Sequence, residues 1–386
     1  MPTKPAKSAS TRPLLVIDGD YPMAIGAIDM GRDLRKPIDE VRRAPRIPAM
    51  STSRPGRADV GTMASLPEMR KGCIAAALVK TVACVLKPTH SHGEYRSYEA
   101  AYGGAMGQLY YYRILEKEGE ARILTTGKAF AEHIKRWESA QAYDSLPVGM
   151  VIGMEGADAI VYPEQVHEWH ADGLRVISLS HYGVSKYSHG SGTGTEGGLT
   201  PDAKPLLAAM DKLGIILDVT HTSDASVRQE FELFSGPVLA SHQNCRAIVP
   251  GERQQPDDIL KEVIRRGGVI GSSMDTYMLN KHYTLDWAST NMPPRRVVYP
   301  SELITLEDVA DHVDYVCQLA GNSHHAAIGG DTDGQGGSDG APHDVDTVAD
   351  YLKLAVILKK RGYKRADIEN VMYKNWQRFF EKWLGD

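Results

Sequence analysis

The chain has 386 residues, which is enough for one decorated α/β barrel or for two smaller domains. Its 42% hydrophobic and 24% charged residues are typical of a soluble globular protein. Its net charge of −5 argues against nonspecific binding to nucleic acid or to an anionic membrane, which needs a basic field. No apolar stretch has the length of a membrane span, and the first 13 residues, which we expect to be a disordered or extended tail, lack the apolar core of a secretory signal. The four cysteines are scattered without a C-x-x-C pair, which favours a reducing cytoplasm.

Eight short apolar runs, several of them rich in β-branched residues, are candidates for buried strands. In chain order they comprise residues 14–17, 74–86, 148–154, 174–180, 214–220, 237–241, 268–273 and 326–330. Helical segments such as 201–213, 256–266 and 306–320 separate many of them. This alternation predicts an α/β fold, a (β/α)8 TIM-type barrel that forms a single domain over residues 14–386 with loop insertions at its mouth. An open doubly wound sheet is the alternative.

The segment from Gly214 to His242 indicates how this fold would build a site. Two apolar runs end on His221 and His242, and a helical segment lies between them. A right-handed crossover makes the two strands parallel neighbours, so both histidines emerge at the same edge of the sheet. Two imidazoles at that edge are typical of a metal site, but they also suit strand ends capped by hydrogen bonds. The pair alone does not separate these two interpretations.

Polar residues end six of the eight predicted strands, which favours a closed ring of strands over an open sheet. These residues are Asp20, Glu155, His181, His221, His242 and Asp331. Glu155, His221 and His242 would form a hydrolytic zinc triad that leaves one position open for water. His181 would hydrogen-bond a developing oxyanion, and Asp331 would transfer a proton. The alternative is that all six satisfy loop amides, but six such ends on one ring favour a metal site.

Three further motifs carry less weight. Residues 192–197 match the dinucleotide pattern G-x-G-x-x-G, but they lie well past the strand end at His181, so we interpret them as a flexible loop. Residues 331–334 begin like a calcium loop whose closing glutamate is absent. His90 and His92 follow a strand two residues apart, and we interpret them as exposed loop residues, with a metal role as the alternative.

Eight short motifs occur in an order and at a spacing that a known family shares. They are Gly153–Gly156, Leu179–His181, Gly198–Thr200, Met210–His221, Ser241–His242, Arg253–Asp258, Gly267–Ile270 and Gly329–Gly334. Together they resemble the membrane (renal-type) dipeptidase family, peptidase M19, a branch of the amidohydrolase-like metal-dependent barrels. The resemblance covers residues 148 to 335 and continues more weakly to the C-terminus.

The resemblance implies a barrel with two zinc ions. The glutamate matched by Glu155 bridges the two metals in the family, and the histidines matched by His221 and His242 hold the second. The first metal is held by the histidine and the aspartate of an Asp-Gly-His-x-Asp run. This chain has Asp20 and Pro22 at those two positions. Asp20 can still donate an oxygen and Pro22 cannot, so we expect one tightly bound zinc ion rather than two.

The resemblance also implies roles in substrate binding and catalysis. The family's substrate-polarising histidine falls on His181, and its catalytic aspartate falls on Asp331. The arginine that binds the substrate carboxylate falls on Arg253. Arg246, which also follows the strand that ends at His242, is a competing candidate.

Two functions are consistent with these residues. The first is a zinc-dependent hydrolase that cleaves a dipeptide, or a related small amide bearing a carboxylate, by attack of metal-bound water. The alternative is a divergent barrel that has lost dipeptidase activity and binds a ligand or catalyses a different reaction on a small molecule. The retained strand-end residues favour the hydrolase, whereas the departure at Asp20 and Pro22 favours the alternative. We expect the substrate to be a small molecule or a dipeptide. We expect neither nucleic acid nor a membrane as a partner, and the sequence is compatible with a homo-oligomer.

Overall fold

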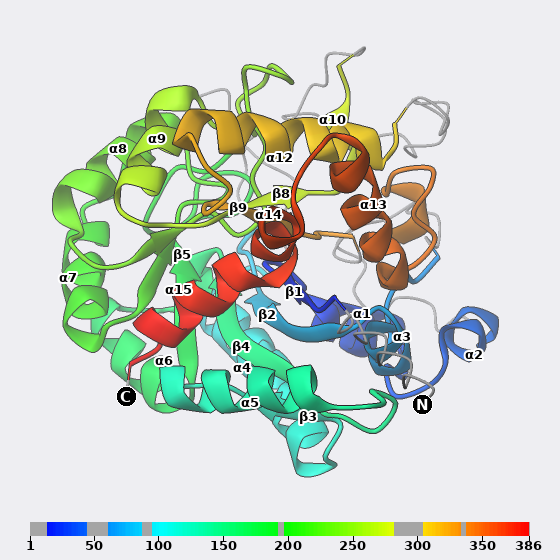
Figure 1. Ribbon diagram of the computed structural model, residues 1–386. Coiled ribbons are helices and arrows are strands. Elements are labelled where there is room, and N and C mark those ends of the chain that lie inside the picture. The colour runs from blue at the N-terminus through cyan, green and yellow to red at the C-terminus, as the bar shows by residue number, and fades with distance from the viewer. Residues whose placement is uncertain are drawn as a thin grey trace, which may run out of the picture.

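In the computed structural model, helices surround a central group of strands (Figure 1). The structure describes residues 14–44, 61–86, 95–191, 197–281, 304–332 and 337–385. Six parallel strands form one curved sheet in the order β1 (Val16–Asp18), β2 (Ile74–Val82), β4 (Val148–Glu155), β5 (Leu174–Ser178), β6 (Ile216–Asp218) and β7 (Val238–Leu239). A second parallel pair consists of β8 (Ile270–Ser273) and β9 (Ala326–Gly329).

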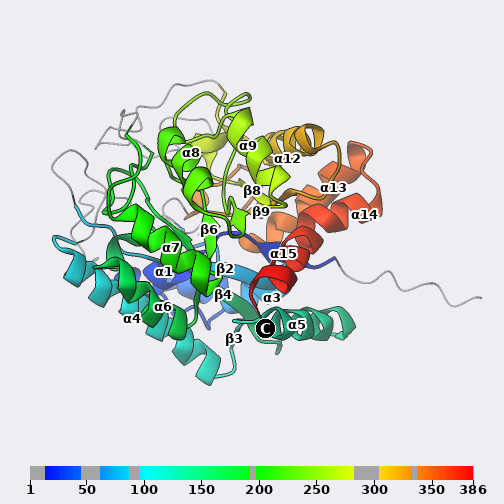
Figure 2. The ribbon, with the colours of Figure 1, turned by 90° about the vertical axis from the view of Figure 1, so that its left-hand side faces the viewer.

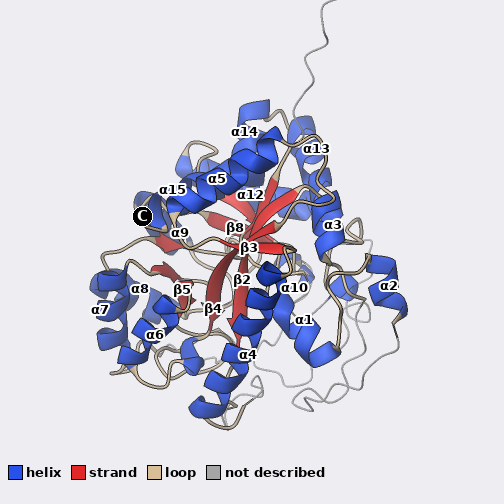
Figure 3. Cartoon of the chain, turned by 90° about the horizontal axis from the view of Figure 1, so that it is seen from below, coloured by secondary structure: helices blue, strands red, loops and turns tan. Residues whose placement is uncertain are grey.

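Backbone contacts at two seams join these sheets into a closed ring. Ala240, directly after β7, forms a parallel bridge with Ile270 of β8. At the other seam the Gly19 amide, directly after β1, donates a hydrogen bond of 2.9 Å to the Ile328 carbonyl of β9. Seen from below, the strands converge at the centre and helices surround them (Figure 3). The predicted (β/α)8 barrel is therefore confirmed, and the open sheet is excluded.

Two details of the strands differ from the prediction. A ninth strand, β3 (Ala121–Ile123), pairs with β4 outside the ring. Three residues are too few to show a hydrophobic period, so the sequence did not reveal it. The second strand, β2, also ends at Val82 instead of continuing to Leu86.

Helices cover the outside of the ring (Figures 1 and 2). In the first half they are α1 (Met23–Met30), α2 (Ile38–Arg43), α3 (Leu66–Lys71), α4 (Tyr98–Lys117), α5 (Gly127–Ser139), α6 (Val166–Ala171) and α7 (Ala203–Leu213). In the second half they are α8 (Asp224–Leu233), α9 (Asp257–Arg265), α10 (Thr276–Leu279), α12 (Leu306–Ala320), α13 (Leu352–Lys360), α14 (Arg365–Glu369) and α15 (Asn375–Trp383). None of the described helices combines the length and the hydropathy that crossing a bilayer requires.

Apolar strands and capped helices explain why the sequence folds in this way. Every residue of β2 and β4 is buried, because both faces of a barrel strand are covered. Ser97, Thr126 and Ser223 begin α4, α5 and α8, and each side chain accepts a backbone N–H of the first helical turn. Near the C-terminus, the Trp376 indole donates to the Ile328 carbonyl at 2.8 Å and so covers the seam between β1 and β9.

Candidate active site

Three of the predicted metal ligands lie at the carboxyl ends of barrel strands, where barrel enzymes build their sites. Glu155 is the last residue of β4, and His221 and His242 follow shortly after β6 and β7. His221 has a φ of 67° and Asp331, after β9, has a φ of 52°. Residues other than glycine seldom adopt this left-handed conformation, so the chain holds strained backbone at two of its strand ends.

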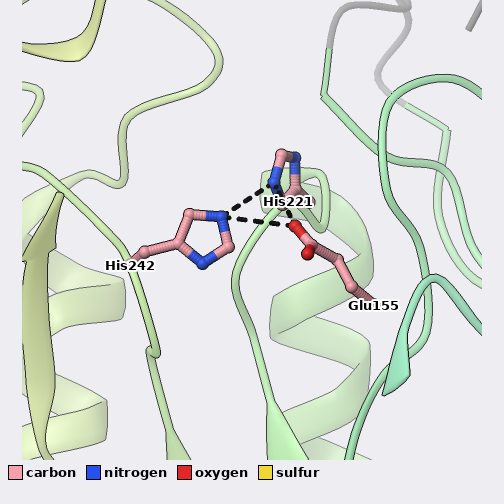
Figure 4. Close-up of side chains that lie close together, drawn as sticks. All are labelled: Glu155, His221 and His242. Atoms are coloured by element: carbon pink, nitrogen blue, oxygen red, sulfur yellow. Dashed lines mark hydrogen bonds and ion pairs between the residues drawn. The ribbon is translucent and has the colours of Figure 1, made fainter. Parts of the chain in front are cut away.

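The side chains of Glu155, His221 and His242 converge on one point (Figure 4). Glu155 Oε1 lies 2.9 Å from His221 Nε2 and 3.3 Å from His242 Nε2. The two Nε2 atoms lie 2.9 Å apart. One oxygen and two nitrogens are thus within ligating reach of a common centre.

The charges of the three groups differ. Burial opposes the ionisation of Glu155, but Lys80 and His242 outweigh it and hold the pKa of Glu155 well below its usual range. Burial and the nearby Arg253 guanidinium hold the pKa of His221 well below its usual range, so this imidazole is neutral. Burial also opposes charge on His242, yet Asp20, Asp331 and Glu155 raise its pKa to about 10.

This donor set fits one divalent metal ion. Two imidazoles and one carboxylate are the ligands of many hydrolytic zinc sites, which keep a position for water or substrate. The three donor atoms all lie within 4.8 Å of one another and are buried. A metal ion would replace the proton that the surrounding carboxylates now stabilise on His242, because ligation requires a neutral imidazole.

The second ring nitrogen of His242, Nδ1, contacts Asp20 and Ser241. His242 Nδ1 lies 3.2 Å from Asp20 Oδ1 and 2.9 Å from Ser241 Oγ. A carboxylate on the far nitrogen of a ligating histidine fixes the tautomer and leaves the near nitrogen free to bind metal. The structure therefore brings Asp20, which the sequence proposed as a metal ligand, against the back of His242.

His181 lies on the rim of the cluster. Its Nε2 is 3.7 Å from Glu155 Oε1, and its ring centroid is 4.4 Å from that of His221. The Tyr182 ring packs edge-on against both imidazoles, with centroids 4.8 Å away in each case. His181 is therefore close enough to contact a group bound at the three converging donors.

Asp331 faces the cluster from the end of β9. Its Oδ2 lies 4.0 Å from His242 Nε2. Burial raises the pKa of Asp331 to about 7, with Asp275, Asp20 and Glu155 adding to the rise against the opposing charge of His242. A carboxyl group whose pKa is near neutrality can both accept and return a proton.

Arg253 reaches the cluster from a fully enclosed position. It is 1% exposed, and its Nη2 lies 3.2 Å from His221 Nε2 and donates to the His242 carbonyl at 3.2 Å. Its Nη1 donates to Gln243 Oε1 at 3.0 Å. The guanidinium thus places a permanent charge directly beside the converging donors.

Arg246, the competing arginine, is engaged elsewhere. Its two terminal nitrogens donate to the Asp224 carboxylate at 2.6 and 2.8 Å, and its Nε donates to the Gly251 and Gln254 carbonyls. This bidentate pair ties the loop after β7 to the start of α8. Of the two arginines, Arg253 is the one whose guanidinium lies against the cluster.

Lys80 is a component of the site that the sequence analysis missed. It is fully buried on β2, and its Nζ lies 2.8 Å from Asp20 Oδ1, Asp218 Oδ2 and Ser241 Oγ. Burial lowers the pKa of a lysine, but Asp20, Asp218 and Glu155 outweigh it and raise the pKa of Lys80. The available signal was that Lys80 is the single charged residue of a strand in which Thr81 is the one other polar residue.

The position where the family resemblance places the first metal ion has fewer free donors than the site formed by Glu155, His221 and His242. Pro22 offers no donor, and Asp20 is already paired with the Lys80 ammonium. A second candidate group, formed by Asp20, His242 and Asp331, shares His242 with the first group. His90 and His92, the alternative ligands, lie outside the described residues, as do residues 192–196 of the glycine-rich motif.

A closed barrel with buried histidines and carboxylates at the carboxyl ends of its strands has its polar groups where barrel enzymes build their active sites. Residues 60–383 match the family described as membrane dipeptidase, peptidase family M19. The chain belongs to this family.

Individual relatives agree with this assignment. A dipeptidase named aclJ, from Aspergillus oryzae, is 30% identical over 242 residues, which is 62% of this chain and 51% of that protein. The crystal structure of dipeptidase AC, a metallopeptidase of the same family, superposes with a TM-score of 0.72 at 21% identity and covers 97% of this chain and 99% of that one. A metallopeptidase from Rhodobacter sphaeroides, solved with a phosphinate mimic of L-Ala-D-Ala, gives 0.71 at 20% identity and covers 96% and 99%. The two structures support the fold, and the chain spans about half the length of the curated relatives it matches.

Proposed function

We propose that this protein is a zinc-dependent hydrolase that cleaves a dipeptide or a related small amide bearing a carboxylate. The observation that carries the proposal is the convergence of Glu155, His221 and His242 within 4.8 Å, with the Arg253 guanidinium 3.2 Å from one of these ligands. Three donors suit zinc, and a buried guanidinium suits a carboxylate. Membership of the M19 family favours this function over a binding barrel that has left hydrolysis.

Each residue has a distinct role in the proposed reaction. A bound zinc ion would supply a Lewis acid and lower the pKa of a water molecule. Asp331 accepts the proton of the attacking water and returns it to the amine nitrogen as the C–N bond breaks. His181 donates a hydrogen bond to the carbonyl oxygen as negative charge develops on it.

Arg253 is proposed to bind the substrate carboxylate. One lone pair on His221 Nε2 cannot serve both a metal ion and the Arg253 Nη2 that lies 3.2 Å away. Metal ligation at this nitrogen would therefore release an Arg253 donor. The released donor is then available to a carboxylate, so metal and substrate binding are coupled through one atom.

Two further properties belong to the proposal. Zinc is favoured as the metal because the ligands are two imidazoles and a carboxylate. A cytoplasmic location is favoured by four scattered cysteines in a chain with no C-x-x-C pair.

The test is hydrolysis of a dipeptide panel that contains both stereoisomers at the second residue. Each dipeptide is paired with its C-terminal carboxamide, which lacks only the charge that Arg253 is proposed to bind. We expect release of free amino acids that stops on chelation, returns with added zinc and is much slower for every carboxamide. Absence of metal-dependent release across the panel would refute the hydrolase, and equal rates for acids and carboxamides would refute the carboxylate requirement.

A further inference from the structure

Lys80 is built into the barrel interior. It lies on β2, in which every residue is buried, and it is paired in register with Gly153 of β4. A Cβ at Gly153 would lie 3.0 Å from Leu78 Cδ1 and 3.3 Å from Lys80 Cγ, both closer than side chains usually pack. The glycine therefore leaves room for the lysine stem, so the cation is held in place by the packing of the strands.

The ammonium contacts two carboxylates and one hydroxyl, all fully buried. Asp20 Oδ1, Asp218 Oδ2 and Ser241 Oγ each lie 2.8 Å from Nζ. Asp218 Oδ2 and Ser241 Oγ accept hydrogen bonds from the ammonium, and Asp20 Oδ1 forms an ion pair with it. Lys80 thus neutralises buried negative charge that would otherwise need another cation.

We propose that the Lys80 ammonium takes the place of the first metal ion of this family, so that the centre holds a single divalent ion on Glu155, His221 and His242. The family resemblance places a first-metal ligand at position 20, and in this chain the residue at that position is Asp20, which lies 2.8 Å from a fixed positive charge. A second cation at Asp20 would be repelled by that charge. Pro22 removes the other first-metal donor. The inference rests on the proposed function for the presence of a metal.

The group formed by Asp20, His242 and Asp331 does not provide an independent second site. His242 Nε2 faces Glu155 and His221, and its Nδ1 faces Asp20 and Ser241. Both ring nitrogens are therefore engaged. Asp331 Oδ2 is 4.0 Å from the nearer nitrogen.

Lys80 also has a positioning role that acts through Asp20. The ammonium orients the Asp20 carboxylate, and Asp20 Oδ1 in turn lies 3.2 Å from His242 Nδ1. A proton held on Nδ1 leaves the lone pair of Nε2 directed at the metal position. Lys80 thus supplies the positive charge that a first metal ion would supply. Through Asp20 it also orients His242, a ligand of the remaining metal ion.

The test is a count of zinc ions per chain in four full-length proteins, by elemental analysis after zinc loading and dialysis. They are the wild type, Asp20→His with Pro22→Asp, Lys80→Gln, and the triple variant that combines all three changes. Glutamine keeps a polar N–H donor but removes the positive charge and has a shorter side chain that ends in an amide. Circular dichroism and melting temperature establish that each variant is folded.

We expect one zinc ion in the wild type and one in Asp20→His/Pro22→Asp, because the lysine is still present. The count should rise to two only in the triple variant, and Lys80→Gln alone should stay at one because Pro22 still offers no donor. Two ions in the wild type, in the double variant or in Lys80→Gln would overturn the proposal, as would one ion in a folded triple variant. If removal of Lys80 prevents folding, the wild type and the double variant still decide the question, because both keep the lysine.

The count is independent of catalysis. A wild type with one zinc ion and no activity on the dipeptide panel would refute the proposed function and leave the replacement by Lys80 standing. A wild type with no zinc at all would refute both. Active protein with two ions would refute the replacement alone.

Discussion

The carboxyl ends of β4, β6 and β7 and those of β1 and β2 balance buried negative charge in different ways. At the first group, Glu155 is surrounded by the imidazoles of His221 and His242, whose donor atoms converge with no lysine among them. At the second group, Asp20 is paired at 2.8 Å with a lysine from the neighbouring strand. In the proposed centre, the first group holds a cation from solution even though Arg253 lies 3.2 Å from His221, whereas Asp20 is balanced by Lys80, a cation of the chain itself.

This contrast indicates how a metal position can disappear from a barrel without loss of the fold. Removal of first-metal ligands would leave a buried carboxylate without a cation, which is costly. A lysine on an adjacent strand removes that cost, because its ammonium neutralises the carboxylate and does not need a set of ligands arranged around it. Under this proposal, membership of the family does not by itself fix the number of metal ions that a chain binds.

The largest expected effect comes from breaking the side that takes a cation from solution. His221→Ala and His242→Ala each remove one of three donors, so zinc affinity should fall by more than ~100-fold, which exceeds the loss typical for outer-shell residues. Isothermal titration of metal-free protein with zinc measures this change. His324→Ala, at an exposed position beyond α12, is the matched control and should bind zinc like the wild type. Unchanged affinity in either site variant would contradict the ligand assignment.

The second effect concerns the proton that Asp331 is proposed to transfer. Asp331→Asn keeps the size of the side chain but cannot accept a proton, so kcat should fall by ~10² to 10⁴-fold. Zinc content and melting temperature should change little, which separates this variant from the histidine variants. Steady-state kinetics on the best dipeptide substrate provides the measurement. Turnover that survives the substitution would show that another group moves the proton.

A smaller effect distinguishes the two arginines. Arg253→Lys keeps the charge but loses the bidentate geometry, so KM for a substrate with a carboxylate should rise by about 10 to 100-fold. Arg246→Lys is the matched control, because the partner of Arg246 is Asp224. This variant should lower the melting temperature and leave KM close to the wild-type value. Saturation curves are measured for both variants and the wild type, on the dipeptide and on its carboxamide. On the carboxamide, Arg253→Lys and the wild type should have similar KM values. A larger rise in KM for Arg246→Lys would reverse the assignment.

The smallest effect, measured per pH unit, tests the charge balance at the end of β1. Burial raises the pKa of Asp18 to about 8, whereas an unfolded aspartate titrates near ~3.9. The folded state therefore binds the proton more tightly, and metal-free wild type should lose roughly 1 kcal/mol per pH unit between about pH 5 and 8 relative to Asp18→Asn. Urea unfolding of both proteins across this range gives the difference. A difference that does not depend on pH would mean that Asp18 is ionised in the folded protein.

Local sequence patterns were sufficient to predict most strands of the barrel. The eight strand runs are apolar enough to be recognised individually, and the strand-end residues Glu155, His221 and His242 follow directly from where those runs stop. The strand Ala121–Ile123 escaped because it is too short for a pattern.

The part of the site that could not be predicted depends on contacts between distant residues. Lys80 lies 138 positions from Asp218, and nothing in the sequence near either residue indicates their ion pair. The choice between Arg246 and Arg253 likewise depends on Asp224, which belongs to a preceding helix. The sequence locates the ends of the strands, whereas charge pairing across the barrel requires the register of the strands.

The left-handed backbone at His221 and Asp331 has a consequence for directed evolution of this protein. Such conformations cost of order 1 to 3 kcal/mol each when the residue is not glycine. Glycine at either position would relieve the strain and remove the side chain that serves the site. Selection for thermal tolerance alone would therefore favour sequences that give up catalysis first, and a screen on this scaffold must impose activity and heat resistance in the same round.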